Sequence, residues 1–259
     1  MKPYTGYVAT LDVLGFSELL FRDRYAEKLR LYLDTINELI RPTHVKVECV
    51  VFSDSIVLTS SGNTEESFRR LIIACSATFH ELIIMCDMPV RGAVAFGHYW
   101  RAASRGSVFL AGRPIVEAYR CERAQKWIGV ILCPSVLHER HDLAPLTDLS
   151  DPSRIGKDDY DLAVRLQPAT VPFHEQGGSL GTIDAYSVIP LASNETPQRA
   201  HRGVQSISAQ PRDLRLKASD PSAQGKYTAS LDWLATVQER LKTFAEAIPP
   251  APSRKASSR

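Results

Sequence analysis

Two aspartates stand directly after short apolar runs, at positions where metal chemistry is possible. The first, Asp12, ends a run that begins at Tyr7 and is followed by Gly15, which indicates a buried strand that ends in a turn. The second, Asp54, lies in Ser53–Ser55 between two further apolar runs, a pattern typical of a β-hairpin turn. Two carboxylates at adjacent strand ends can hold divalent cations through oxygen ligands. The sequence therefore predicts a metal site formed by Asp12 and Asp54.

The composition excludes several classes of protein. The chain has 259 residues, of which 44% are hydrophobic and 23% charged, as in an ordinary globular protein. A net charge of +2 gives no electrostatic reason to expect nucleic acid or a membrane surface as a partner. No apolar run approaches the ~20 residues of a membrane span, and no two cysteines form a CxxC pair. We therefore expect a cytoplasmic protein with reduced cysteines and with no nucleic-acid or membrane partner.

The apolar periodicity predicts the elements that position these aspartates. After the first strand, the expected order is a helix over 17–41, a hairpin over 45–59, a helix ending near 87, a strand over 88–97, a helix over 112–126, a strand over 127–133, a short helix over 134–141, a weak segment over 142–176 and a strand over 183–189. The buried stripe expected on the first helix is Leu29, Leu33, Ile36 and Ile40. Asn63 and Glu66 form the expected capping pair of the second helix. The side chains expected on the buried face of a last helix are Leu234, Val237, Leu241 and Phe244.

This order of strands and helices is typical of an α+β, ferredoxin-like (palm) fold. Such a domain has a mixed, mostly antiparallel sheet with helices packed on one face, and here a C-terminal helix is added to it. The first strand and the hairpin are adjacent in this arrangement. We therefore expect Asp12 and Asp54 to face each other at one edge of the domain.

Four segments of the chain resemble the class III nucleotidyl cyclases. Ala9–Ser17 is similar to their metal-binding strand, and Phe52–Val57 lies where they carry Gly-Asp on a hairpin. Val90–Gly97 is similar to their R-x-G strand, and Gly112–Arg120 to their G-x-x-V-N-x-A-x-R helix. The resemblance covers residues 7–133 and implies a palm-like cyclase domain that works as a homodimer.

The chain departs from this family at three positions that bear on the base and the ribose. Val50, four residues before Asp54, and Phe109, three before Gly112, stand where base-selecting polar residues are expected, and Val116 replaces an asparagine. Purine readout needs polar groups there, because an unpaired polar base edge is costly. This set is similar to the pyrimidine cyclases of Pycsar anti-phage defence systems. The resemblance implies conversion of UTP to 3′,5′-cyclic UMP and pyrophosphate, with CTP and cyclic CMP as the alternative.

The resemblance also implies roles for individual residues. Asp12, Asp54 and the backbone carbonyl of Val13 would bind two Mn²⁺ or Mg²⁺ ions per site. Arg120 would be catalytic, stabilising charge on the α-phosphate at the site of the other subunit. The side chains expected against the nucleotide are Phe16, Val50 and Phe109.

Other hypotheses remain open. A catalytically silent dimerisation or nucleotide-sensing module would explain Val116, although both aspartates are retained. A diguanylate cyclase is disfavoured, because the hairpin does not match G-G-[DE]-[EF]-F. A cyclase product would act as a second messenger on a separate effector protein. The expected division of the chain is a catalytic domain over 1–190, a polar loop or lid over 191–226, a C-terminal helix over 227–248 and a disordered tail over 249–259.

Overall fold

The computed structural model describes residues 3–21, 25–40, 47–104, 107–141, 143, 147–149, 155–156, 159–174, 180–191 and 221–247. Its elements are, in order, β1 (Tyr4–Val13), α1 (Phe16–Leu20), α2 (Tyr25–Ile40), β2 (Glu48–Phe52), β3 (Ser55–Ser61), α3 (Glu65–Cys86), β4 (Val90–Ser104), β5 (Ser107–Gly112), α4 (Arg113–Ala124), β6 (Gly129–Leu132), α5 (Pro134–Glu139), α7 (Tyr160–Arg165), β7 (Leu166–His174), β8 (Leu180–Val188) and α10 (Pro221–Ala247). Within these ranges, no helix combines the length and the apolar character that a membrane span requires.

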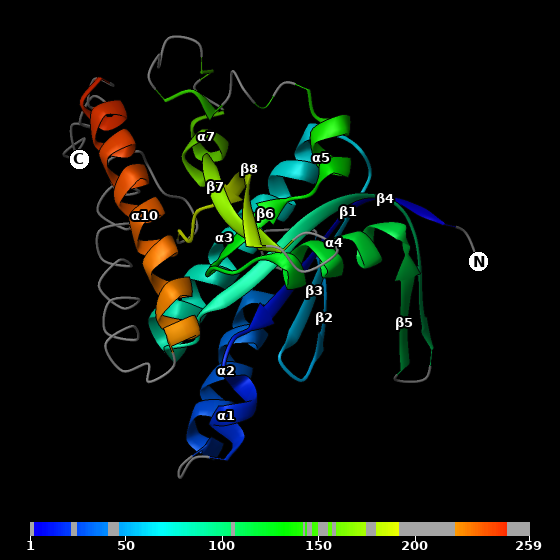
Figure 1. The fold of residues 1–259 in the computed structure, drawn as a ribbon. Helices are drawn as coiled ribbons and strands as arrows, with labels where there is room; N and C mark the ends of the chain where they lie inside the picture. Colours follow the sequence, from blue (N-terminus) through cyan, green and yellow to red (C-terminus); the bar gives the residue numbers. More distant parts are fainter. Residues whose placement is uncertain are drawn as a thin grey trace, which may run out of the picture.

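A single sheet forms the centre of the described structure (Figure 1). Its strands follow the order β2-β3-β1-β4-β6-β8-β7, and β5 pairs with the far end of β4. Strand β1 lies between β3 and β4 and is antiparallel to both, whereas β4 and β6 are parallel. The predicted mixed, mostly antiparallel sheet, with the first strand next to the hairpin, is therefore confirmed.

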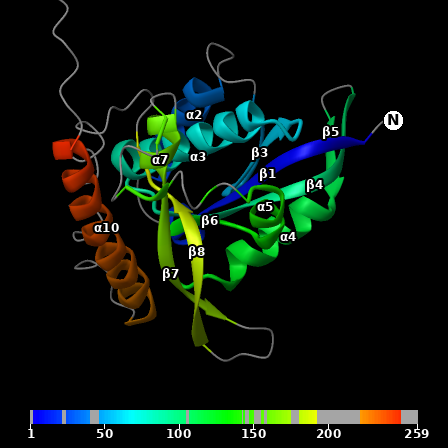
Figure 2. The ribbon, with the colours of Figure 1, turned by 90° about the horizontal axis from the view of Figure 1, so that it is seen from above.

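The two faces of the sheet are covered by different helices. Because successive side chains of a strand point to opposite faces, β4 contributes to an apolar cluster on each side of the sheet. The cluster under α2 and α3 takes four side chains from β1: Tyr7, Ala9, Leu11 and Val13. The opposite face, under α4 and α10, takes Ala93 and Ala95 from β4. Figure 2 shows α3 and α4 on opposite sides of these strands, so the prediction that helices cover only one face is wrong.

The first helical segment also differs from the prediction. It consists of α1 and α2 rather than one helix, and α2 buries Tyr32 and Ile36 while Leu29 is partly buried. Leu33 is exposed, so its expected place in the buried stripe is wrong. Tyr32 and Ile36 are four residues apart and lie on the same side of α2, whereas Leu33 is turned about 100° from Tyr32. The side chain of Ile40 lies outside the described part of the chain.

The start of α3 is capped by a residue other than the predicted pair. Thr64 Oγ1 accepts a hydrogen bond from the backbone N–H of Ser67 at 3.1 Å. The expected pair Asn63 and Glu66 is therefore wrong, and Glu66 instead accepts a hydrogen bond from Arg70 at 2.6 Å on the helix surface. A threonine hydroxyl in this position satisfies one of the free N–H groups of the first turn.

The C-terminal third contains elements that the sequence pattern hides. Strand β7 is at the edge of the sheet and carries Pro168 and Pro172, whose missing N–H groups are tolerated on an edge strand. The predicted last strand is β8, and α10 begins at Pro221, before the expected residue 227. The side chains of α10 that lie in the core are, as predicted, Leu234, Val237, Leu241 and Phe244. Most of the expected lid, 192–220, and the tail from 249 lie outside the described residues.

Candidate active site

The end of β1 and the turn between β2 and β3 bring Asp12 and Asp54 together. Asp12 pairs in register with Ser55, the first residue of β3. The backbone N–H of Val13 donates a hydrogen bond to the carbonyl oxygen of Asp54 at 3.1 Å, which fixes the turn against the strand. Ser53 has a positive φ of 57°, the left-handed conformation that closes this tight turn.

The electrostatic environment of Asp12 reflects both burial and neighbouring charges. Partial burial raises the pKa of the Asp12 carboxyl, the Arg91 charge opposes this shift, and the Asp54 charge adds to it. Because the Asp54 charge raises the pKa of Asp12, the two carboxylates lie within electrostatic range of each other. A pair of carboxylates that repel one another is the arrangement that a divalent cation relieves.

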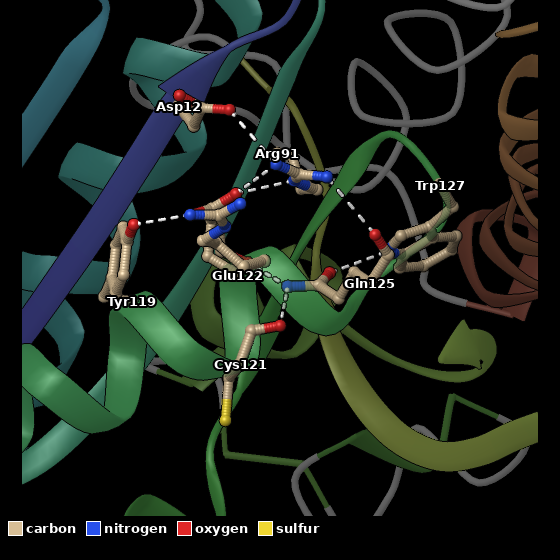
Figure 3. A network of polar contacts seen from close by, with 9 residues as sticks. Asp12, Arg91, Tyr119, Cys121, Glu122, Gln125 and Trp127 are labelled. Atoms are coloured by element: carbon tan, nitrogen blue, oxygen red, sulfur yellow. Dashed lines mark hydrogen bonds and ion pairs between the residues drawn. The ribbon is translucent and has the colours of Figure 1, made fainter. Parts of the chain in front are cut away.

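Arg91 links Asp12 to helix α4 (Figure 3). It lies on β4 directly opposite Asp12, and its Nη2 is 3.2 Å from Asp12 Oδ2. The same Nη2 is 2.5 Å from Glu122 Oε1 on α4, and Nε donates to that oxygen at 2.6 Å. Burial raises the pKa of Glu122 to about 7, the Arg91 charge opposes the shift, and the Asp12 charge adds to it. Three charged side chains from three elements thus form one ion-pair cluster.

The end of α4 is fastened to β4 beside this cluster. Gln125 Nε2 donates to the carbonyl oxygen of Gly92 at 2.8 Å, and Trp127 Nε1 donates to Gln125 Oε1 at 2.7 Å (Figure 3). A Cβ at Gly92 would lie 2.6 Å from the carbonyl oxygen of Thr10, so glycine is needed for β4 to lie this close to β1. The position of α4 is therefore tied to the strand that carries Arg91.

Arg91 and Glu122 were absent from the predicted site. Arg91 stands in a segment that resembles the family, but Glu122 is thirty-one residues away along the chain, and no local pattern shows that the two residues pair. A signal for Glu122 does exist in the sequence. The buried residues of α4 are Pro114, Ala118 and Glu122, spaced four apart on one side of the helix. A glutamate that continues a buried stripe requires a basic partner.

Arg120 lies on the other side of α4. Since each residue advances about 100° around an α-helix, Arg120 and Glu122 point about 160° apart. Arg120 is exposed and lines an open pocket of about 830 Å³ together with Arg113, Glu117, Arg123, Phe173 and His174. The lining of this pocket does not include Asp12 among the described residues. Arg120 therefore lies on the side of α4 away from Glu122, which is joined to Asp12 through Arg91.

The three side chains expected against a nucleotide have different surroundings. Val50 is half-buried and shares a sheet face with Asp12, because Val50, Val57 and Thr10 are paired across β2, β3 and β1. Phe109, on β5, is 55% exposed. The side chain of Phe16 is buried in the core against the ring of Tyr32, which differs from the expected contact with a nucleotide.

Comparisons with known proteins give matches at the level of the fold. No family model and no curated protein matches the sequence. Among solved structures, the adenylyl cyclase CyaB from P. aeruginosa has a similar fold. The match covers 75% of this chain and 98% of CyaB, with 12% sequence identity and a TM-score of 0.50. The non-canonical dimeric guanylyl cyclase domain of the RhoGC fusion protein, from the aquatic fungus Blastocladiella emersonii, matches 73% of this chain over 98% of its own length, with 12% identity and a TM-score of 0.52. The chain therefore has the α+β, palm-like fold of class III nucleotidyl cyclase domains.

Proposed function

We propose that this protein is a metal-dependent pyrimidine nucleotide cyclase that converts UTP to 3′,5′-cyclic UMP and pyrophosphate. The observation that carries the proposal is the arrangement of Asp12 and Asp54 at adjoining ends of β1 and the β2–β3 turn, in a cyclase-like fold. Burial raises the pKa of Asp12, and the Asp54 charge raises it further, so the charged pair is disfavoured without a cation. Such a pair is best explained by a ligand that needs two carboxylates.

The donor set fits Mg²⁺ or Mn²⁺. Asp12, Asp54 and the backbone carbonyl of Val13 offer only oxygen atoms, which hard divalent cations prefer. In the described part of the chain, no group of three or more histidine, cysteine or acidic side chains forms a complete metal cage. Two carboxylates and the backbone carbonyl would hold an ion whose remaining positions are filled by water, and by phosphate oxygens once a substrate is bound. The bound ions would lower the pKa of the ribose 3′-hydroxyl and neutralise charge on the triphosphate.

The residues of the chain would then hold the substrate for an internal displacement. The ribose 3′-oxygen bonds to the α-phosphorus, the bond from that phosphorus to the bridging oxygen breaks, and pyrophosphate leaves. The proton of the 3′-hydroxyl passes to water. Arg120 would stabilise the negative charge that builds on the α-phosphate.

We propose that each site is shared by two copies of the chain. Arg120 lies on the exposed side of α4, away from the buried Glu122, where it would serve the aspartates of a partner. Both regions that would meet expose large apolar side chains: Phe52, Phe109, Val116 and Tyr119. Phe52 is 82% exposed. It lies on the same face of the sheet as Asp12, because both residues pair with Ser55 of β3. A second copy that covers these side chains would complete the site.

The preference for a pyrimidine rests on Val50 and Phe109. Both are apolar, so they offer no hydrogen bond to the polar edge of a purine. The two solved relatives are named for adenylyl and guanylyl cyclase activity, which makes these positions the expected point of difference. UTP is favoured over CTP, with cytidylate cyclase as the alternative. The cyclic nucleotide would serve in the cytoplasm as an anti-phage second messenger for a separate effector protein.

A catalytically silent cyclase-like module is the second candidate. Val116, on the exposed side of α4, stands where the resembled family carries a ribose-positioning asparagine. A module of this kind would bind nucleotide or dimerise without turnover.

Incubation with each of the four nucleoside triphosphates separately, in the presence of Mn²⁺, tests the proposal. Products are resolved by mass. We expect 3′,5′-cyclic UMP from UTP, and no product from Asp12→Ala or Asp54→Ala. Cyclic CMP would retain the reaction and change the base, whereas a cyclic purine would contradict the roles of Val50 and Phe109. Nucleotide binding without any product would favour the silent module.

A further inference from the structure

Arg91 lies between two carboxylates but is bound unequally by them. Two of its nitrogens, Nε and Nη2, contact Glu122 Oε1 at 2.6 and 2.5 Å. Its contact with Asp12 Oδ2 is single and longer, at 3.2 Å. Charge-assisted hydrogen bonds are strongest at the shorter distances. The guanidinium is therefore held mainly by Glu122.

The three side chains also differ in their access to water. The side chain of Glu122 is 4% exposed, that of Arg91 12% and that of Asp12 28%. When Glu122 is charged, as at mildly alkaline pH, its depth of burial makes a charged partner necessary, because water cannot replace that partner. Asp12 is accessible enough to exchange one cation for another. Arg91 also donates through Nη1 to the carbonyl oxygen of Gln125 at 3.3 Å, so it keeps partners if Asp12 leaves.

We propose that Glu122 is a positioning residue for the metal site, which retains Arg91 and balances its charge when Asp12 binds a divalent cation. This inference rests on the proposed function, because it assumes that Asp12 is a metal ligand. With Glu122 present, Arg91 and Glu122 form a nearly neutral pair and Asp12 keeps its charge for the cation. Without Glu122, the guanidinium loses its main partner and turns its charge to Asp12, where it competes with the cation.

The binding of Mn²⁺ without nucleotide tests this role. Free Mn²⁺ is counted by its electron paramagnetic resonance signal during titration of the full chain at mildly alkaline pH. We expect Glu122→Gln, which keeps the size of the side chain and removes its charge, to weaken Mn²⁺ binding by about tenfold. Arg91→Gln alone should not weaken it. The double variant Arg91→Gln with Glu122→Gln should bind within about threefold of the unaltered chain, since it removes both charges.

The pattern of these variants separates charge balance from a merely structural role. If the pair only held the fold, both single variants would weaken binding and the double variant would be the weakest. That result would overturn the inference, as would normal Mn²⁺ binding by Glu122→Gln. Thermal unfolding of each variant confirms that the titrated protein is folded.

Two further variants complete the design. Glu66→Gln removes the same charge from the surface pair of Glu66 and Arg70, and should change Mn²⁺ binding by less than about twofold. Asp12→Ala should abolish the binding that the other variants modulate. If Asp12→Ala binds Mn²⁺ normally, the proposed metal site itself is wrong. If Asp12→Ala fails to bind while Glu122→Gln binds normally, the inference alone is wrong.

Discussion

The two faces of strand β1 differ in what their side chains do. One face carries the core residues Tyr7, Ala9, Leu11 and Val13, which pack under α2 and α3. The other face carries Asp12, opposite Arg91, and continues across β3 and β2 to the exposed Phe52. Neighbouring residues of one strand therefore have separate tasks. The face under α3 holds one apolar core, whereas the opposite face is apolar at Ala93 and Ala95 and becomes polar and partly open at the strand ends that carry Asp12 and Arg91.

The largest effect should come from the open face. Asp12→Ala should reduce cyclic nucleotide formation by about 1000-fold or more, because the loss of one carboxylate removes a charge that the metal site requires. Its unfolding free energy should change little, since burial already disfavours the charged carboxylate. Initial rates and urea unfolding, measured on the same preparation, check both statements.

The matched change on the closed face is Leu11→Ala, one residue earlier on the same strand. Leu11 is fully buried, so the variant should lose about 2–5 kcal/mol of unfolding free energy through lost packing and the cavity left behind. The folded fraction should keep most of its turnover. Urea unfolding measures the loss, and activity is corrected for the folded fraction. A Leu11→Ala protein of normal stability and no activity would remove the distinction between the two faces.

The smaller effect concerns the ionisation of Glu122 in the metal-free protein. Its pKa is about 7 in the folded chain, against 4.5 for an unperturbed glutamate. The folded state therefore binds more protons than the unfolded state between these values, so stability falls as pH rises from about 4.5 to about 7. The fall should be at most of the order of 3 kcal/mol.

Urea unfolding across this pH range checks the prediction. Glu122→Gln should show a shallower fall than the unaltered chain. An equally steep fall in both proteins would show that Glu122 does not titrate in this window.

Local patterns predicted the parts of the fold that depend on neighbouring residues. The apolar run before Asp12 and the turn at Asp54 predict β1 and the hairpin, and their adjacency follows from the order of the elements. The final helix is predicted from the periodic spacing of its apolar residues. On α2, in contrast, the spacing of the leucines predicted that Leu33 is buried. The buried side chain is instead Tyr32, whose ring packs against Phe16.

The parts of the fold and of the site that the sequence did not predict depend on contacts between distant segments. Strand β7 was hidden by its prolines, which only an edge position in the sheet makes acceptable. The cluster of Asp12, Arg91 and Glu122 joins β1, β4 and α4, and no local spacing encodes which charge meets which. The opposed directions of Arg120 and Glu122 follow from helix geometry once α4 is placed on the sheet.

Mixing two inactive variants tests the shared site most directly. Asp12→Ala and Arg120→Ala are each purified, combined, dissociated and reassociated, and assayed with the nucleotide that the unaltered chain turns over. In a mixed dimer, one site contains both substitutions and the other contains neither. Since half of the random dimers are mixed and each has one intact site, the mixture should regain about a quarter of the unaltered activity. A mixture that stays as inactive as its components would contradict a site built from Asp12 of one chain and Arg120 of the other.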